Sequence, residues 1–127
     1  MIEKEFVPYE EALALKELGF DEPCNTCYDK LEMVASYGAS VFDYKNYNTS
    51  GYMVSRPTFS QAFRWFRDNY RLNTQIAFCE YSVSSENSWK YTLDNPTNVL
   101  IWNGKFNTYE EAELECLKVL IEMVKTK

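Results

Sequence analysis

The stretch from Pro57 to Arg71 constrains the fold more than any other part of this chain. Pro57 suits the first turn of a helix, because the backbone N–H that proline lacks would have no partner there. The apolar residues that follow are spaced to share one helical face: Phe59, Ala62, Phe63, Phe66 and Tyr70. The stretch therefore predicts an amphipathic helix with one side in the core, against which the other elements pack.

The predicted central helix also gathers the arginines of the chain. Arg64, Arg67 and Arg71 fall within about 60° of one another on a wheel of 3.6 residues per turn. With Arg56 just before the helix, these are all four arginines of a protein whose formal net charge is -6. Within the stretch only Asp68 offsets them. The arginines either form an anion-binding flank or pair with an acidic helix.

Two further helices are expected, one near each end of the chain. The first opens at Pro8 and ends at Gly19, a residue suited to the left-handed turn that closes many helices. The second covers residues 109–124 and begins with a capping box formed by Thr108 and Glu111. Its apolar face is wide, which indicates either heavy burial or a dimer contact.

The other periodic segments predict short strands. They cover residues 25–29, 31–36, 41–44 and 52–55 before the central helix, and 73–82, 89–93 and 99–102 after it. Residues 46–51 are rich in turn formers and are expected to be a mobile loop, with Tyr44, Tyr47 and Tyr52 exposed around it. The order of elements predicts one α+β domain over residues 1–127. We expect a mainly antiparallel sheet of about five to six short strands with three helices packed on it.

Composition limits the classes of function. The 19 acidic residues against 13 basic ones argue against duplex nucleic acid as a partner, although a local anion site is compatible with this balance. The N-terminus lacks the pattern of a signal peptide, and no apolar run approaches the roughly 20 residues that span a bilayer. We therefore expect a cytoplasmic protein without a membrane segment. Aromatic residues make up 17%, so several are expected at a surface, pocket or interface.

The sequence predicts neither a metal site nor an active site. Cys24 and Cys27 form a C-x-x-C pair, but zinc needs further ligands, and Cys79 and Cys116 stand alone in a chain without histidine. We expect plain reduced thiols and no cofactor. The absence of histidine also removes Ser-His-Asp and Cys-His nucleophilic systems, and the carboxylate pairs stand near helix starts, where they stabilise the helix dipole. No catalytic residues are predicted, and the protein is not expected to be an enzyme.

Three segments carry a resemblance to a known group of proteins. EKEFVPYEEALALKELGFDEPC, QAFRWFRDNYRL and TYEEAELECLKVLIEMVK together resemble a family of small, uncharacterised proteins encoded by phages and prophages of gut bacteria. The resemblance covers the N-terminal third, the central helix and the C-terminal helix. It implies a phage-type protein of the host cytoplasm, a context in which host interaction and counter-defence are frequent. It assigns no activity, cofactor or site residue.

Two hypotheses of function follow. The first is a protein that sequesters a nucleotide-derived host signal, with arginines on the phosphates and aromatic rings on the base. Its candidate ligand-binding residues are Arg56, Arg64, Arg67, Arg71, Tyr70, Trp89 and Trp102. It predicts a concave pocket where arginines meet Tyr or Trp, at a subunit interface of a homo-oligomer. The second is a module that binds and inhibits a host protein, and it predicts an exposed apolar patch in place of a pocket. Binding of single-stranded nucleic acid ranks third, because the net charge is negative.

If instead the arginines are structural, the candidate counter-ions are Glu110, Glu113 and Glu115.

Overall fold

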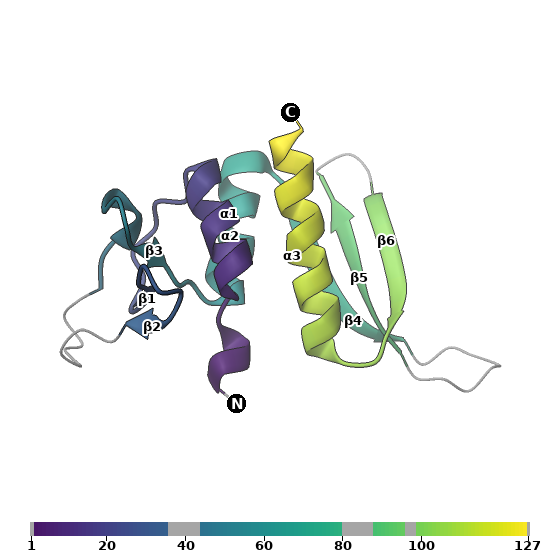
Figure 1. Cartoon of the computed structure of the whole chain (residues 1–127). Helices are drawn as coiled ribbons and strands as arrows, with labels where there is room; N and C mark the ends of the chain where they lie inside the picture. The colour runs from purple at the N-terminus through teal and green to yellow at the C-terminus, as the bar shows by residue number, and fades with distance from the viewer. Residues whose placement is uncertain (1, 36–43, 80–87, 96–98, 127) are drawn as a thin grey trace.

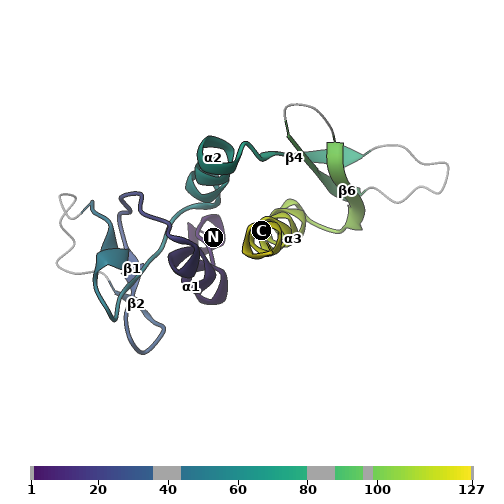
Figure 2. The same cartoon turned by 90° about the horizontal axis from the view of Figure 1, so that it is seen from above.

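The computed structural model describes residues 2–35, 44–79, 88–95 and 99–126 of the chain. Three α-helices stand in the middle: α1 (Tyr9–Leu18), α2 (Phe59–Tyr70) and α3 (Tyr109–Lys125). A three-stranded sheet lies on either side of them (Figures 1 and 2). The predicted α+β class is confirmed, with six strands in the described residues. These strands are divided between two sheets.

Helix α2 begins at Phe59, two residues after Pro57, which the sequence places in the first turn. Thr58 is the N-cap: its hydroxyl accepts from Gln61 N at 3.1 Å, and the Gln61 side chain accepts from Thr58 N at 3.1 Å. Pro57 therefore precedes the helix, and its carbonyl accepts from Val7 N at 2.9 Å. Arg71 closes the helix with φ 55°, in the left-handed region.

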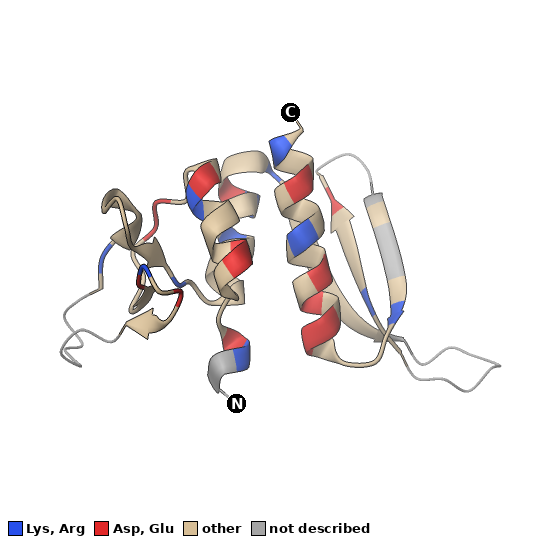
Figure 3. Ribbon diagram, in the orientation of Figure 1, with Lys and Arg blue, Asp and Glu red and all other residues tan. Residues whose placement is uncertain are grey.

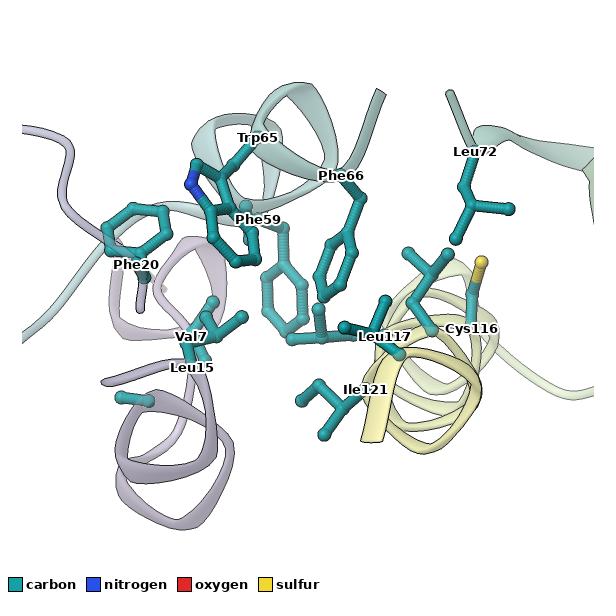
Figure 4. Packing of buried hydrophobic residues seen from close by; sticks show 14 of the residues in the cluster. Val7, Leu15, Phe20, Phe59, Trp65, Phe66, Leu72, Cys116, Leu117 and Ile121 are labelled. Atoms are coloured by element: carbon teal, nitrogen blue, oxygen red, sulfur yellow. The ribbon is translucent and has the colours of Figure 1, made fainter. Parts of the chain in front are cut away.

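The core lies where the three helices meet. Phe66 of α2 and Leu117 of α3 are completely buried, and Figure 4 shows them side by side between the helices. Trp65 is also buried, with its ring 5.5 Å from that of Phe20 and 5.1 Å from that of Phe66. The core face of α2 thus extends to Trp65, whereas Phe63, predicted to be in the core, is half-buried.

The larger sheet consists of β4 (Asn73–Cys79), β5 (Ser88–Asp94) and β6 (Val99–Phe106), antiparallel in that order. Helix α3 packs on one face of it, and Tyr91 and Leu93 are buried there. Strand β6 continues to Phe106, so the end predicted at residue 102 is wrong. Phe106 pairs with Trp89, and an irregularity between Trp89 and Tyr91 takes up the difference in register. The end predicted for the first of these strands, residues 80–82, lies outside the described residues.

The smaller sheet has the order β2–β1–β3, from β1 (Cys27–Tyr28), β2 (Val34–Ala35) and β3 (Val54–Ser55). Its position matches the prediction, but each strand is only two residues long. Of the strand expected over residues 41–44, residues 41–43 lie outside the described residues, and Tyr44 lies in no strand.

The segment expected to be a mobile loop contains a short 3-10 helix, η2 (Tyr47–Thr49). Asn48 anchors it: the side-chain Nδ2 donates to Phe20 O at 2.9 Å, and Oδ1 accepts from Ser55 N at 2.8 Å. Lys16 of α1 donates to the carbonyl of Ser50 at 2.9 Å. Tyr47 is buried, so the expectation that it is exposed is wrong, whereas Tyr44 and Tyr52 are exposed as predicted.

Candidate functional site

In the part of the chain that the structure describes, the arginines along α2 do not line either of the two hollows. Arg64 forms an ion pair with Glu22, 2.6 Å from Nη2 to Oε1, and the hydrogen bond in this pair raises the pKa of the guanidinium. Arg67 and Arg71 are exposed and make no ion pair within the described part of the chain. The flank predicted from helical spacing exists, but one of its charges is already neutralised.

The partner of Arg64 differs from the acidic helix considered above. Glu22 lies in the connection after α1, whereas the described ion pairs of α3 are internal to that helix. Glu115 pairs with Lys118 at 3.7 Å and Glu122 with Lys125 at 3.9 Å. Figure 3 shows these acidic and basic residues along α3. The pairing with Glu110, Glu113 or Glu115 is therefore wrong for Arg64.

The aromatic candidates are spread over different surfaces. Tyr70 is half-buried, and its ring lies 5.5 Å from that of Trp65. Trp89 packs edge-on against Phe78 and against Tyr109 of α3, with ring centroids at 5.1 and 5.3 Å. These two contacts occupy part of the Trp89 ring surface on which a base would stack. For Trp102 the structure gives the backbone position, opposite Thr92.

Arg56 has a different environment from the other arginines. Its guanidinium carbon lies 4.1 Å from the centroid of the Phe6 ring and 5.6 Å from that of Tyr28. Tyr28 is itself fixed, because its hydroxyl donates to Val7 O at 2.7 Å. Arg56 Nε is buried and has no hydrogen-bond partner among the described residues. Two aromatic rings thus hold this side chain in place without neutralising it.

A group of exposed apolar side chains surrounds the hairpin of β1 and β2, a feature that the sequence analysis missed. We call it the hairpin patch: Leu31, Met33, Val34 and Tyr52, with 69%, 62%, 49% and 60% of their surface exposed. An open hollow of about 530 Å³ adjoins it, lined by Asp29, Lys30, Leu31 and Tyr52. The sequence predicts a strand over residues 31–36, but β2 begins at Val34, and residues 31–33 lie in the connection between β1 and β2.

Hydrogen bonds hold the turn that carries the patch. Asp29 Oδ1 accepts from Leu31 N at 2.8 Å and from Met33 N at 3.1 Å. Asp29 N donates to Met33 O at 2.8 Å, and Glu32 takes the left-handed conformation with φ 63°. An aspartate that accepts from backbone N–H groups two and four residues ahead is a common way to fix a turn. Leu31 and Met33 are therefore presented to solvent from an ordered backbone.

The described cysteines lack the environment of reactive thiols. Cys24, Cys27 and Cys116 are buried, and burial raises the pKa of Cys24 and of Cys116 to about 12. Burial also raises the pKa of Cys27. Because the thiolate is the nucleophile and the metal ligand, these groups are poorly suited to redox or metal chemistry. In the described residues no three His, Cys, Asp or Glu side chains are grouped so that they could hold a metal ion.

Glu113 is the carboxyl group with the most perturbed environment. It is 9% exposed on α3, and burial, followed by the negative charge of Glu110, raises its pKa to about 7. A hydrogen bond from Tyr109 acts in the opposite direction. A carboxyl group that titrates near neutrality is a candidate acid or base. It does not line either hollow described here, the second of which lies over Lys118, Val119, Glu122, Met123 and Thr126.

The helices that the structure describes are too short or too polar to cross a lipid bilayer. Among the described residues, the hairpin patch is exposed and Arg56 Nε lacks a partner, and Tyr28 links Arg56 to Val34 of the patch. A scan against protein-family models and searches of curated proteins and solved structures found no match to this chain.

Proposed function

We propose that this chain is a protein-interaction module that docks on a partner protein through the hairpin patch. The observation that carries the proposal is the exposure of four large apolar side chains on one ordered hairpin and on the segment that leads into β3. Because exposed apolar side chains that are grouped together often mark interaction sites, this surface fits a protein partner. The resemblance to phage and prophage proteins makes a host protein the proposed partner, with inhibition of that protein as the outcome.

The energetic argument is favourable for a small interface. Complete burial of a leucine or methionine side chain contributes about 1.5–3 kcal/mol relative to exposure. Leu31 and Met33 expose most of their surface to water. A partner that covers both therefore gains much of this free energy of burial from each side chain. The hydrogen bonds of Asp29 fix the turn beforehand, which lowers the entropy lost on binding.

The nucleotide-sequestration hypothesis has weaker support. It requires arginines and aromatic rings around one hollow, whereas Arg64 is paired with Glu22 and Trp89 packs against its own neighbours. Neither described hollow is lined by an arginine. A thermal-shift screen against linear and cyclic nucleotides tests it directly, because a ligand at 100 times its Kd adds about 2.7 kcal/mol of stability.

Site-specific photo-cross-linking tests the docking surface. A benzoylphenylalanine side chain is placed at Leu31, and at the exposed Ser60 of α2 as a control, and each protein is irradiated in cytosolic extracts of gut bacteria. We expect a discrete adduct with another protein from the Leu31 position and not from Ser60. Mass spectrometry identifies the partner, which is then purified for binding measurements.

Substitution of the patch provides the quantitative test. Met33→Asp places a charge on a side chain that is 62% exposed, so folding is preserved while burial against a partner becomes unfavourable. We expect at least a roughly tenfold loss of affinity, and no loss for the charge-matched control Ser60→Asp. Equal adducts from both positions, or unchanged binding by Met33→Asp, would refute the proposal. An adduct with a second copy of this chain alone would replace it by self-association.

A further inference from the structure

The surroundings of Arg56 restrict how its charge can be used. Phe6 covers one part of the guanidinium, with 4.1 Å between the guanidinium carbon and the ring centroid, and Tyr28 covers another at 5.6 Å. Rings next to the guanidinium exclude water from its faces, and the planar group then interacts through its edge. Nε is buried and without a partner, whereas the side chain as a whole is only half-buried. The terminal nitrogens are therefore the part available to a ligand.

The chain supplies no described counter-ion for this arginine. Arg64 has a carboxylate at 2.6 Å, but no described ion pair or side-chain hydrogen bond involves Arg56. Arg67 and Arg71 also lack a described ion pair, but both are exposed to water, whereas Arg56 Nε is buried. Rigid side chains with unmet hydrogen-bonding capacity lose little entropy on binding, so this arginine is suited to take its partner from another molecule.

Arg56 adjoins the hairpin patch through Tyr28. In the small sheet Val34 of the patch is the partner of Tyr28 on β2, and Val54 is its partner on β3. Side chains that face each other across a strand pair lie about 4.5–5.5 Å apart at Cβ. Arg56 is two residues beyond Val54, which places it on the same face, with its guanidinium next to the Tyr28 ring. Arg56 and Val34 of the patch thus lie on one face of the small sheet, whereas Leu31, Met33 and Tyr52 lie outside its strands.

We infer that Arg56 is a receptor for a carboxylate of the partner protein, adjacent to the apolar residue that covers Val34 of the hairpin patch. This inference rests on the proposed docking function and specifies the chemistry of its partner: an aspartate or glutamate next to a large apolar side chain. A carboxylate matches the planar donor edge of a guanidinium with two hydrogen bonds. The apolar residue supplies affinity, and the carboxylate selects among apolar segments.

The first test observes Arg56 in the unmodified protein, so it does not depend on a variant folding. Each of the four arginines contributes one Nε–H signal to a ¹⁵N–¹H spectrum, and the signals are assigned in the unmodified protein by through-bond correlation to the backbone. The probe is N-acetyl-leucyl-aspartate N-methylamide, titrated at constant ionic strength. The neutral N-acetyl-leucyl-asparagine N-methylamide is the matched control, and inorganic phosphate is a second anion.

We expect the aspartate probe to shift the Arg56 signal in a saturable manner, and the asparagine probe to leave it in place. Arg67, which is exposed and has no described ion pair, reports the non-specific effect of the anion. Equal shifts of Arg56 and Arg67 would overturn the inference. A stronger, saturable response of Arg56 to phosphate than to the aspartate probe would overturn the choice of a carboxylate.

The second test uses the partner identified by cross-linking and separates this inference from the proposed function. Arg56→Lys keeps the charge but removes the planar pair of donors, so we expect at least a roughly tenfold loss of affinity, with Arg67→Lys unchanged. If Met33→Asp weakens binding and Arg56→Lys does not, the docking function stands and the carboxylate receptor is refuted. If neither variant weakens binding, both are refuted.

Discussion

Replacement of Glu113 by glutamine is expected to stabilise the protein, and to do so in a pH-dependent manner. The carboxyl group is 9% exposed, and its pKa rises from an ordinary value of 4.5 to about 7 in the folded state. The folded chain therefore keeps a proton that the unfolded chain releases as the pH rises from 4.5 to 7. Its free energy of unfolding falls over that range and is lower by about 3 kcal/mol above it. Glutamine has no charge to desolvate and can still accept the hydrogen bond from Tyr109.

Urea denaturation at several pH values measures this effect. We expect Glu113→Gln to raise the free energy of unfolding by less than about 1 kcal/mol at pH 5 and by up to about 3 kcal/mol at pH 8. Glu122→Gln is the control, because Glu122 lies on the same helix and its side chain is 70% exposed. Its effect should be small and nearly constant with pH. A Glu113→Gln effect that is equal at pH 5 and pH 8, or a loss of stability at pH 8, would contradict the argument from burial.

Three further predictions concern the core, a helix cap and the thiols. Leu117→Ala removes a completely buried side chain and should cost about 2–5 kcal/mol of unfolding free energy in urea denaturation. A cost below about 1 kcal/mol would contradict its place in the core. Thr58→Ala removes the hydrogen bond to Gln61 N and should cost about 1 kcal/mol in the same assay, with Thr58→Ser close to the parent. Cys24 and Cys116, with pKa values of about 12, should be alkylated by iodoacetamide at pH 8 only after unfolding, as followed by peptide mass mapping. Alkylation of the folded protein at the rate of a free thiol would show that they are accessible.

The helices could be predicted from the sequence because each follows from local chemistry. The apolar spacing that begins at Phe59 places α2, and the Thr108 cap, which accepts from Glu111 N at 3.1 Å, places the start of α3. Trp65 shows the limit of this reasoning. Its position on the helical wheel lies at the margin of the apolar face, and it is buried because Phe20 of another segment packs against it. Contacts between distant segments are not encoded in helical spacing.

The sequence predicted the positions of the strands more accurately than their arrangement into sheets. The alternation of residues 89–93 predicted the strand β5, and Tyr91 and Leu93 of this strand are buried under α3. Nothing in a two-residue strand such as β1 indicates which sheet it joins, because pairing depends on which segments the helices bring together. The division into two sheets on either side of the helices was therefore outside what local patterns can indicate.

The candidate site shows the same limit more strongly. The concentration of arginines is a true feature of the sequence, but the ion pair of Arg64 joins residues 42 positions apart and has no local signal. The exposure of Leu31 and Met33 has no local signal either, because a sequence pattern predicts burial for an apolar residue unless its surroundings are known. The one available signal was Asp29. An aspartate at the start of a turn can accept hydrogen bonds from the backbone N–H groups that follow it, which fixes the loop while the next side chains stay exposed.

The distribution of charge and apolar surface determines which residues can give affinity and which can give selectivity. Exposed arginines such as Arg67 attract anions of any kind, and their interactions are weakened by salt. An apolar patch binds any surface of fitting shape, so Leu31 and Met33 alone would be promiscuous. In the proposed complex Arg56 makes binding more selective. A partner that covers the edge of its guanidinium without supplying a carboxylate would leave a desolvated cation unpaired. Under the proposed docking function, the arginine that lies off the helical flank, and not the three that lie on it, is therefore the one expected to decide which protein binds.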